Sequence, residues 1–162
     1  MVVLLMGVAG AGKTKVGTRL ASELGWEFAD ADDYHPAANV EKMRNGIPLS
    51  DEDRWPWLER LQAVIAEWIT MGKSGVLACS ALKQVYRDRL VVEPEVRVVY
   101  LKADRERLKR RLLARHGHYM RESMLDSQFA TLEEPSDVVV VDADAGVEEV
   151  VAEIQGKLEQ GT

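Results

Sequence analysis

The stretch GVAGAGKT, residues 7–14, decides the fold of this 162-residue chain. It follows the apolar run Val2–Met6, which predicts a strand, and it precedes a segment with Val16, Leu20 and Leu24 at helical spacing. A turn of the pattern G-x-x-x-x-G-K-[ST] between a strand and a helix wraps backbone N–H groups around phosphate, and the helix N-terminus adds partial positive charge. The sequence therefore predicts a phosphate-binding loop made by Gly7, Ala9, Gly10, Ala11, Gly12, Lys13, Thr14 and Lys15.

Two side chains of this loop carry chemistry. Lys13 would reach the outer phosphates of a nucleotide, and the Thr14 hydroxyl can ligate Mg²⁺. The alternative is a glycine-rich turn with a fortuitous Lys-Thr pair, but the flanking strand and helix favour the phosphate loop. Neither Asn39 nor Asn45 is followed by Lys, so the Asn-Lys-x-Asp signature for guanine is missing. A GTPase is therefore disfavoured.

The order of the elements predicts an α/β fold. Short Val-rich runs without polar alternation are typical of parallel strands whose two faces are both covered. Helical patterns alternate with these runs, beginning at Lys13 and covering about 52–71, 82–90, 105–115 and 147–158, and the second of these begins with a capping-box pattern at Ser50 and Asp53. We expect one domain over residues 1–162, a five-stranded parallel sheet with helices on both faces, with strands at Val2–Met6, Trp26–Ala29, Val76–Cys79, Val96–Leu101 and Val138–Val141.

Composition excludes several classes of protein. The 21 basic and 27 acidic residues give a net charge of −6, which argues against a nucleic-acid surface. No segment approaches the ~20 apolar residues of a membrane span, and no Lys or Arg precedes the apolar opening run as a signal peptide would require. The single cysteine, Cys79, is interpreted as a core residue, and the four tryptophans as packing groups. We expect a cytoplasmic protein.

Carboxylates follow the second predicted strand in DADDYHP, residues 30–36. An acid there can hold a water of the Mg²⁺ shell, and another can accept the proton of an attacking hydroxyl. The alternative is a turn that is rich in Asp because Asp favours turns. Asp142 ends the apolar string VVVVD, and we interpret it as a strand-end residue rather than a metal ligand.

Five strings together carry a resemblance to a known family. They are GVAGAGKT, DADDYHP, KMRNGIPLSDEDRWPWL, CSALKQVYRDRL and RHGHYMRESMLDSQFATLEEP, and they span nearly the whole chain. In this order they resemble the small gluconate kinases (gluconokinases) of the P-loop kinase group. The resemblance implies ATP-dependent phosphorylation of D-gluconate at its terminal hydroxyl, giving 6-phosphogluconate. It also implies the fold of shikimate and nucleoside monophosphate kinases, a mobile lid at about residues 115–133, and the homodimer that is usual in this family.

The resemblance further implies a role for individual residues. Asp30 would sit near the Mg²⁺ shell, and Asp32 would contact the substrate and act as the catalytic base. Lys13, Arg111 and Arg115 would complete the catalytic set, with Arg111 also at the ATP. The residues around the sugar acid would be Asp32, Arg54, Ser80, Lys83, Arg87, His118 and Gln128.

The chemistry of gluconate agrees with this set. A polyol with one carboxylate needs one or two cations and several hydrogen-bonding groups, and Arg meets a carboxylate with two parallel bonds. Alternatives stay open, because Arg54 could pair only with Asp51 or Asp53, and Lys83 and Arg87 could be a solvated pair on one helical face. Two other functions also stay open: a shikimate or nucleotide kinase on the same fold, and a regulatory module gated by ATP hydrolysis.

Overall fold

A computed structural model describes residues 1–114 and 122–160 of the chain. Its sheet has five strands in the order β2-β3-β1-β4-β5, and every pair is parallel. The expected α/β class is therefore confirmed. Each strand lies within one residue of its predicted bounds, and the strands are β1 (Val2–Met6), β2 (Glu27–Asp30), β3 (Gly75–Ala78), β4 (Val96–Lys102) and β5 (Val139–Asp142).

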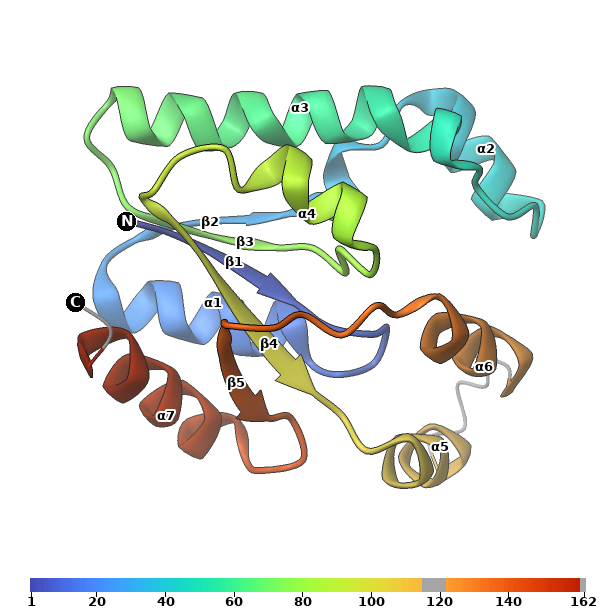
Figure 1. Cartoon of the computed structure of the whole chain (residues 1–162). Coiled ribbons are helices and arrows are strands. Elements are labelled where there is room, and N and C mark those ends of the chain that lie inside the picture. The colour runs from blue at the N-terminus through green and yellow to red at the C-terminus, as the bar shows by residue number, and fades with distance from the viewer. Residues whose placement is uncertain (115–121, 161–162) are drawn as a thin grey trace.

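Helices cover both faces of the sheet (Figure 1). The face that carries Val3 and Leu5 packs against α1 (Lys13–Leu24) and α7 (Val147–Gln160). The opposite face carries Leu4 and packs against α3 (Asp51–Thr70) and α4 (Gln84–Leu90). Strand β1 is buried along its whole length, which explains its uninterrupted apolar sequence.

Helix α3 begins with the capping box that the sequence predicts. The Ser50 hydroxyl accepts a hydrogen bond from the backbone N–H of Asp53 at 3.1 Å, and the Asp53 carboxylate accepts one from the backbone N–H of Ser50 at 2.9 Å. These two bonds satisfy N–H groups that the first helical turn leaves without partners. The capping box therefore fixes the residue at which α3 begins.

Three helical segments were not predicted from the sequence. They are the 3₁₀ helix η1 (Ala31–Tyr34), α2 (Ala37–Arg44) and α6 (Glu122–Thr131). Helix α2 has a single buried residue, the polar Asn39. Its sequence therefore lacks the apolar stripe from which an amphipathic helix is predicted. Helix α6 lies inside the segment 115–133 that we predicted as a lid, and residues 115–121 of that segment lie outside the described residues.

The carboxyl ends of the strands share one edge of the sheet, where α2, α5 (Arg105–Ala114) and α6 also gather (Figure 1). Ligands of such sheets bind at this edge. Within residues 1–114 and 122–160, no helix has the length and hydropathy that a membrane crossing needs.

A substitution at Gly75, at the start of β3, tests how closely the sheet packs against α3. A Cβ atom there would lie 2.5 Å from Cε3 of Trp68, which is itself buried. We expect Gly75→Ala to lower the free energy of unfolding by about 1–3 kcal/mol, because the indole has no room to withdraw. Urea unfolding monitored by circular dichroism would measure the change.

Gly156 in the interior of α7 is the matched control. A Cβ atom there would meet no heavy atom within 4 Å. Gly156→Ala should therefore raise the free energy of unfolding by about 0.5–1 kcal/mol, because Ala restricts the unfolded chain. Equal unfolding midpoints for the two variants would contradict this view of the interface between β3 and α3.

Candidate active site

The site is a cavity of about 870 Å³ at the carboxyl edge of the sheet. Its walls come from the phosphate loop, η1, the segment before α3, the loop after β3, α5, α6 and the turn between β5 and α7. Of the residues predicted from the sequence, the lining includes Ala9, Gly10, Ala11, Gly12, Lys13, Thr14, Lys15, Asp30, Asp32, Arg54, Ser80, Arg111 and Gln128.

The phosphate loop is closely packed against the sheet. A Cβ atom on Gly7 would lie 2.8 Å from the backbone oxygen of Leu101, so a side chain is excluded at this position. The Lys13 ammonium donates to the backbone oxygens of Gly7 at 2.9 Å and Val8 at 3.2 Å. Burial lowers the pKa of Lys13, while the negative charges of Asp32 and Asp30 oppose that shift.

Thr14 and Asp30 form a pair of oxygen groups beside the loop. The Thr14 hydroxyl donates to Oδ2 of Asp30 at 2.8 Å, and Oδ1 of Asp30 accepts from the backbone N–H of Asp32 at 3.0 Å. This second bond caps η1 and holds Asp32 next to Asp30. Burial, followed by the charge of Asp30, raises the pKa of Asp32, and Lys13 opposes the rise.

Arg54 enters the cavity from the first turns of α3. Its Nη1 donates to the backbone oxygen of Leu49 at 2.8 Å and to the Tyr86 hydroxyl at 3.1 Å, and the guanidinium lies over the Tyr86 ring. Both hydrogen bonds use the same nitrogen of the Arg54 guanidinium, Nη1. Within the described part of the chain, no hydrogen bond uses Nε or Nη2 of Arg54, so these groups are available to a ligand.

The acidic neighbours of Arg54 are bound to other cations, so the alternative that Arg54 only pairs with Asp51 or Asp53 is not what the structure shows. Asp53 accepts from Lys42, at 2.9 Å from each carboxylate oxygen. Asp51 accepts from Lys83 at 3.1 Å and from the Tyr86 hydroxyl at 2.5 Å. These hydrogen bonds lower the pKa of both carboxyls, that of Asp53 to about 2.

Lys83 and Arg87 are not found among the described residues that line the cavity, in contrast to the role implied by the resemblance. They are not a solvated pair either, because Lys83 precedes α4 and bonds Asp51, whereas Arg87 is only 2% exposed. The Arg87 guanidinium donates to the backbone oxygens of Ala81, Leu82 and Glu133. Arg87 thus joins the loop after β3 to the segment that follows α6, and it supplies donors to carbonyl oxygens of both.

Two further predicted residues, Gln128 and Arg111, line the cavity close to the phosphate loop or to the turn before α7. The side-chain oxygen of Gln128 accepts from the backbone N–H of Ala9 at 3.1 Å, so α6 lies against the phosphate loop. Nη2 of Arg111 is buried, lies 3.6 Å from the Asp144 carboxylate, and has no hydrogen-bond partner within the described residues. A buried donor without a partner is costly, and because Arg111 lines the cavity, a ligand bound there can supply the acceptor.

His35 is a polar residue of the cavity that the sequence analysis missed. Its ring stacks on Trp57 with 4.4 Å between ring centroids and 10° between the planes, and both residues line the cavity. The sequence position could have indicated this role, because His35 belongs to the same string DADDYHP as the predicted site residues Asp30 and Asp32. Trp57 packs in the core as predicted and is also a wall of the site.

The remaining predicted residues have varied outcomes. Arg115 and His118 lie outside the described residues. Cys79 is buried in the core on the α3 side of the sheet, and burial raises the pKa of its thiol to about 12, so it is a core residue as expected. Asp142 ends β5, and its carboxylate accepts from the backbone N–H of Asp144.

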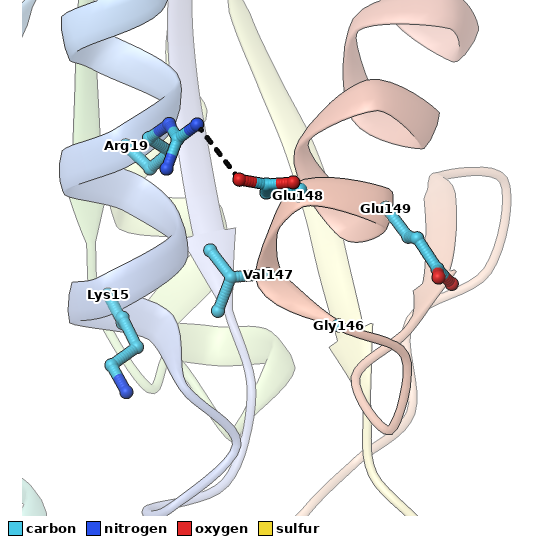
Figure 2. Close-up of a pocket in the computed structure, with 6 residues that line it drawn as sticks. All are labelled: Lys15, Arg19, Gly146, Val147, Glu148 and Glu149. Atoms are coloured by element: carbon cyan, nitrogen blue, oxygen red, sulfur yellow. Dashed lines mark hydrogen bonds and ion pairs between the residues drawn. The ribbon is translucent and has the colours of Figure 1, made fainter.

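A second, shallower hollow lies between α1 and the start of α7 (Figure 2). Arg19 donates to Glu148 across it at 3.4 Å and also pairs with Glu23. Lys15 of the phosphate loop lines both hollows. Because the charges of Arg19 are already met by these carboxylates, we consider the larger cavity as the site.

Comparison with known proteins assigns the family. The shikimate kinase family model matches residues 9–159. A probable gluconokinase from Xenopus tropicalis is 42% identical to the chain, with 99% of the chain and 94% of that relative covered. A gluconokinase structure from Sinorhizobium meliloti superimposes with a TM-score of 0.86 at 39% identity, covering 98% of this chain and 91% of that one. The chain belongs to the gluconokinase family.

Gluconokinases share their fold with the wider group that the shikimate kinase model describes. The shikimate kinase structure from Aquifex aeolicus covers 99% of this chain and 98% of its own, with a TM-score of 0.60 and 17% identity. That likeness concerns the fold alone. The resemblance to gluconokinases, which rested on the five strings, is confirmed.

Substitution of Arg87 tests whether its buried hydrogen bonds stabilise the fold. We expect Arg87→Met to lower the free energy of unfolding by at least about 2 kcal/mol, because each buried acceptor left without a donor costs about 1–3 kcal/mol. Lys83→Met, which breaks a half-exposed pair with Asp51, should cost no more than about 1 kcal/mol. Urea unfolding of the two variants would measure the difference, and an equal or larger loss for Lys83→Met would contradict it.

Proposed function

We propose that this protein transfers the γ-phosphoryl group of ATP to the terminal hydroxyl of D-gluconate, giving 6-phospho-D-gluconate and ADP. The observation that carries the proposal is one cavity in which the phosphate loop, Asp32 and Arg54 meet, in a chain 42% identical to a probable gluconokinase. Transfer of a phosphoryl group to a sugar acid requires a phosphate-binding loop, a carboxylate that accepts the proton, and a cation with free donors.

The nucleotide would occupy the side of the cavity formed by the phosphate loop, Arg111 and the turn before α7. Apolar side chains at Ala143, Ala145 and Val147 suit a flat base, and Nη2 of Arg111, which has no hydrogen-bond partner among the described residues, is a donor for the nucleotide. Lys13 would exchange its backbone contacts for phosphate oxygens. The ammonium is already held over the loop, so little movement is needed.

Thr14 and Asp30 fit a magnesium ion, because Mg²⁺ prefers oxygen ligands such as hydroxyl, carboxylate and water. Thr14 would ligate the ion, and Asp30 would hold a water of its shell. Bound Mg²⁺ would neutralise charge that develops on the phosphates. The backbone N–H of Asp32 keeps the Asp30 carboxylate in place for this task.

The sugar acid would occupy the opposite side of the cavity. Nε and Nη2 of Arg54 would bind its carboxylate, since Nη1 is already held by Leu49 and Tyr86. Asp32 would accept the proton of the terminal hydroxyl as the new bond from oxygen to the γ-phosphorus forms and the bond to the ADP oxygen breaks. Its raised pKa makes Asp32 a better base than an ordinary aspartate.

The decisive experiment measures ADP release from Mg-ATP by the purified protein with single acceptors. D-gluconate, shikimate, other sugar acids, free sugars and nucleoside monophosphates would be compared, with Lys13→Met as the blank. Stimulation by gluconate alone supports the proposal. Stimulation by another acceptor would keep the kinase and reject the substrate, and ATP binding without any stimulation would favour a regulatory module.

Asp32→Asn tests the base. We expect turnover to fall by about 10²- to 10⁴-fold with little change in the ATP Michaelis constant, because an amide cannot accept the proton. In the wild type, turnover should fall as the pH drops through the raised pKa of Asp32, since the protonated carboxyl is inactive. Steady-state rates across pH would show both effects.

Asp33→Asn is the matched control for the base. Asp33 is a neighbouring, exposed carboxylate that does not belong to the described lining of the cavity. Its replacement should leave turnover within about twofold of the wild type, since surface substitutions usually have small effects. A normal rate for Asp32→Asn, or an equal loss for the two variants, would remove Asp32 from the role of base.

Arg54→Ala tests the carboxylate contact. Losing a charged hydrogen bond costs about 1.5–3 kcal/mol, so kcat/KM for gluconate should fall roughly ten- to a hundredfold while ATP binding is kept. Arg60→Ala is the control, because Arg60 lies on the same helix, is exposed and is absent from the described lining. Unchanged gluconate kinetics in Arg54→Ala would place the carboxylate elsewhere.

A further inference from the structure

His35 lies at the end of η1, with its ring between Trp57 and the cavity. Stacking on the indole at 4.4 Å holds the plane of the imidazole. Trp57 is itself anchored, because its indole N–H donates to the backbone oxygen of Ala31 at 2.7 Å. The ring of His35 is therefore presented to a ligand in one fixed orientation.

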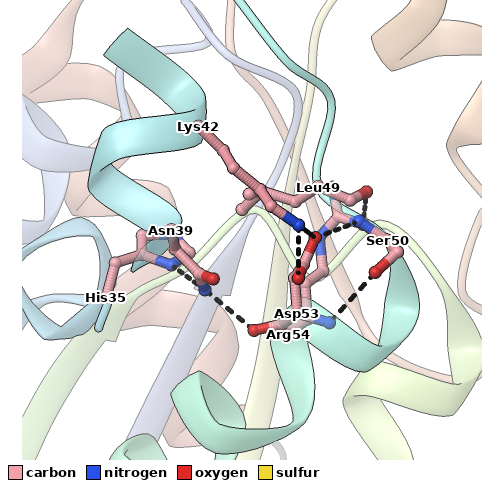
Figure 3. Close-up of polar contacts among 7 residues, drawn as sticks. All are labelled: His35, Asn39, Lys42, Leu49, Ser50, Asp53 and Arg54. Atoms are coloured by element: carbon pink, nitrogen blue, oxygen red, sulfur yellow. Dashed lines mark hydrogen bonds and ion pairs between the residues drawn. The ribbon is translucent and has the colours of Figure 1, made fainter. Parts of the chain in front are cut away.

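Asn39 determines which ring nitrogen of His35 carries the proton. Asn39 is only 3% exposed, and its Nδ2 donates to the backbone oxygen of Asp53 at 2.8 Å (Figure 3). A carbonyl oxygen can only accept, so the amide orientation is fixed. The same Nδ2 lies 3.2 Å from Nδ1 of His35. Nδ1 must therefore accept, and the proton resides on Nε2.

The environment also keeps the imidazole neutral. Burial, followed by the positive charge of Arg54, lowers the pKa of His35 to about 4. Lys42 and Asp53 pair with each other, so their charges largely cancel beside the ring. Figure 3 shows the charged side chains of Lys42, Asp53 and Arg54 near His35 and Asn39. In addition, Asp32 lines the same cavity, and Arg60 donates to the backbone oxygen of Tyr34, the residue before His35.

The Nε2–H of His35 is thus a donor without an assigned partner. Within the part of the chain that the structure describes, the ring contacts the Asn39 amide at Nδ1 and stacks on the face of Trp57. Neither contact uses Nε2, and His35 lines the cavity together with Asp32 and Arg54. A neutral donor suits a hydroxyl oxygen, whereas the carboxylate of a sugar acid is better served by the charged Arg54.

We propose that His35 is a specificity-determining residue whose Nε2–H donates to one hydroxyl along the carbon chain of the sugar acid, and that Asn39 is the positioning residue that fixes this tautomer. The proposal rests on the proposed function, since it concerns the acceptor side of the same cavity. It explains how a protein can select a polyhydroxy acid, because a donor left unpaired disfavours acids that lack the hydroxyl.

The first experiment compares His35→Phe with His35→Gln. Phe keeps an aromatic ring on Trp57 but has no donor, whereas Gln restores an N–H at a similar reach. We expect kcat/KM for gluconate to fall roughly tenfold in His35→Phe and to recover in part in His35→Gln, with the ATP Michaelis constant unchanged in both. Thermal unfolding of each variant reports whether the fold is kept.

Deoxy analogues identify the contact itself. Aldonates that each lack a single hydroxyl would be assayed with the wild type and with His35→Phe. The wild type should discriminate against one analogue by roughly tenfold, and His35→Phe should use gluconate and that analogue equally. If His35→Phe keeps the gluconate kinetics and the full discrimination of the wild type, the proposal is wrong.

The tautomer can be measured without any assay of activity. Nitrogen-15 correlation spectra of the three histidines, with His35→Phe for assignment, should show a neutral ring protonated at Nε2 at pH 6. Asn39→Asp should move the proton to Nδ1 or charge the ring, and raise the gluconate Michaelis constant. Asn45→Asp, an exposed change in the same region, should do neither.

The outcomes separate this proposal from the proposed function. A wild type that gluconate does not stimulate would reject the function and this proposal with it. A wild type that uses gluconate, combined with a His35 ring protonated at Nδ1 or charged at pH 6, would reject only the role of His35. If Asn39→Asp does not fold, the His35 variants and the wild-type spectra still decide.

Discussion

Strand β1 is the constraint on which the site depends. It pairs with β3 on one edge and β4 on the other, and its side chains are buried on both faces, so no part of it can shift without breaking the core. The phosphate loop leaves this strand at Met6 and is pressed against Leu101 at Gly7. The position of Lys13 is therefore set by the interior of the sheet rather than by the loop itself, and the cavity is built around a rigid point.

Charge is distributed in the cavity so that particular groups stay available. Asp51 accepts from Lys83 and Tyr86, and Asp53 accepts from Lys42 while it caps α3. These pairings leave Nε and Nη2 of Arg54 free of bonds to any described residue. The backbone oxygen of Asp53 also orients Asn39, and through it His35. The start of α3 thus organises both the cation and the neutral donor on the acceptor side.

Helix α6 and the segment after it are bonded to the phosphate loop and to α4. Gln128 near its middle accepts from the phosphate loop at Ala9, and the segment after it is bonded to Arg87 and to Gln84 through Glu133. The loop that carries Ser80 lies between these contacts, and its neighbour Ala81 has a left-handed backbone with φ of 45°. Because a non-glycine residue rarely adopts this conformation, the bonds from Arg87 to Ala81 and Leu82 help to hold the loop in place.

The amino-acid sequence by itself determined the fold class, the phosphate loop and the order of the strands along the chain, because these follow from local patterns: glycines before Lys13, Val-rich runs, and a capping box at Ser50 and Asp53. The acids after β2 were also indicated by their place at a strand end, and the family resemblance added Arg54 and the individual roles of Asp30 and Asp32. Helix α2 was missed because its single buried residue is Asn39. Only the tertiary structure decided that Arg87 is buried against Glu133 and that His35 faces the cavity on Trp57, since these contacts join residues 46 and 22 positions apart. A local pattern cannot encode them, because they depend on how α3, α4 and α6 pack around the carboxyl edge of the sheet.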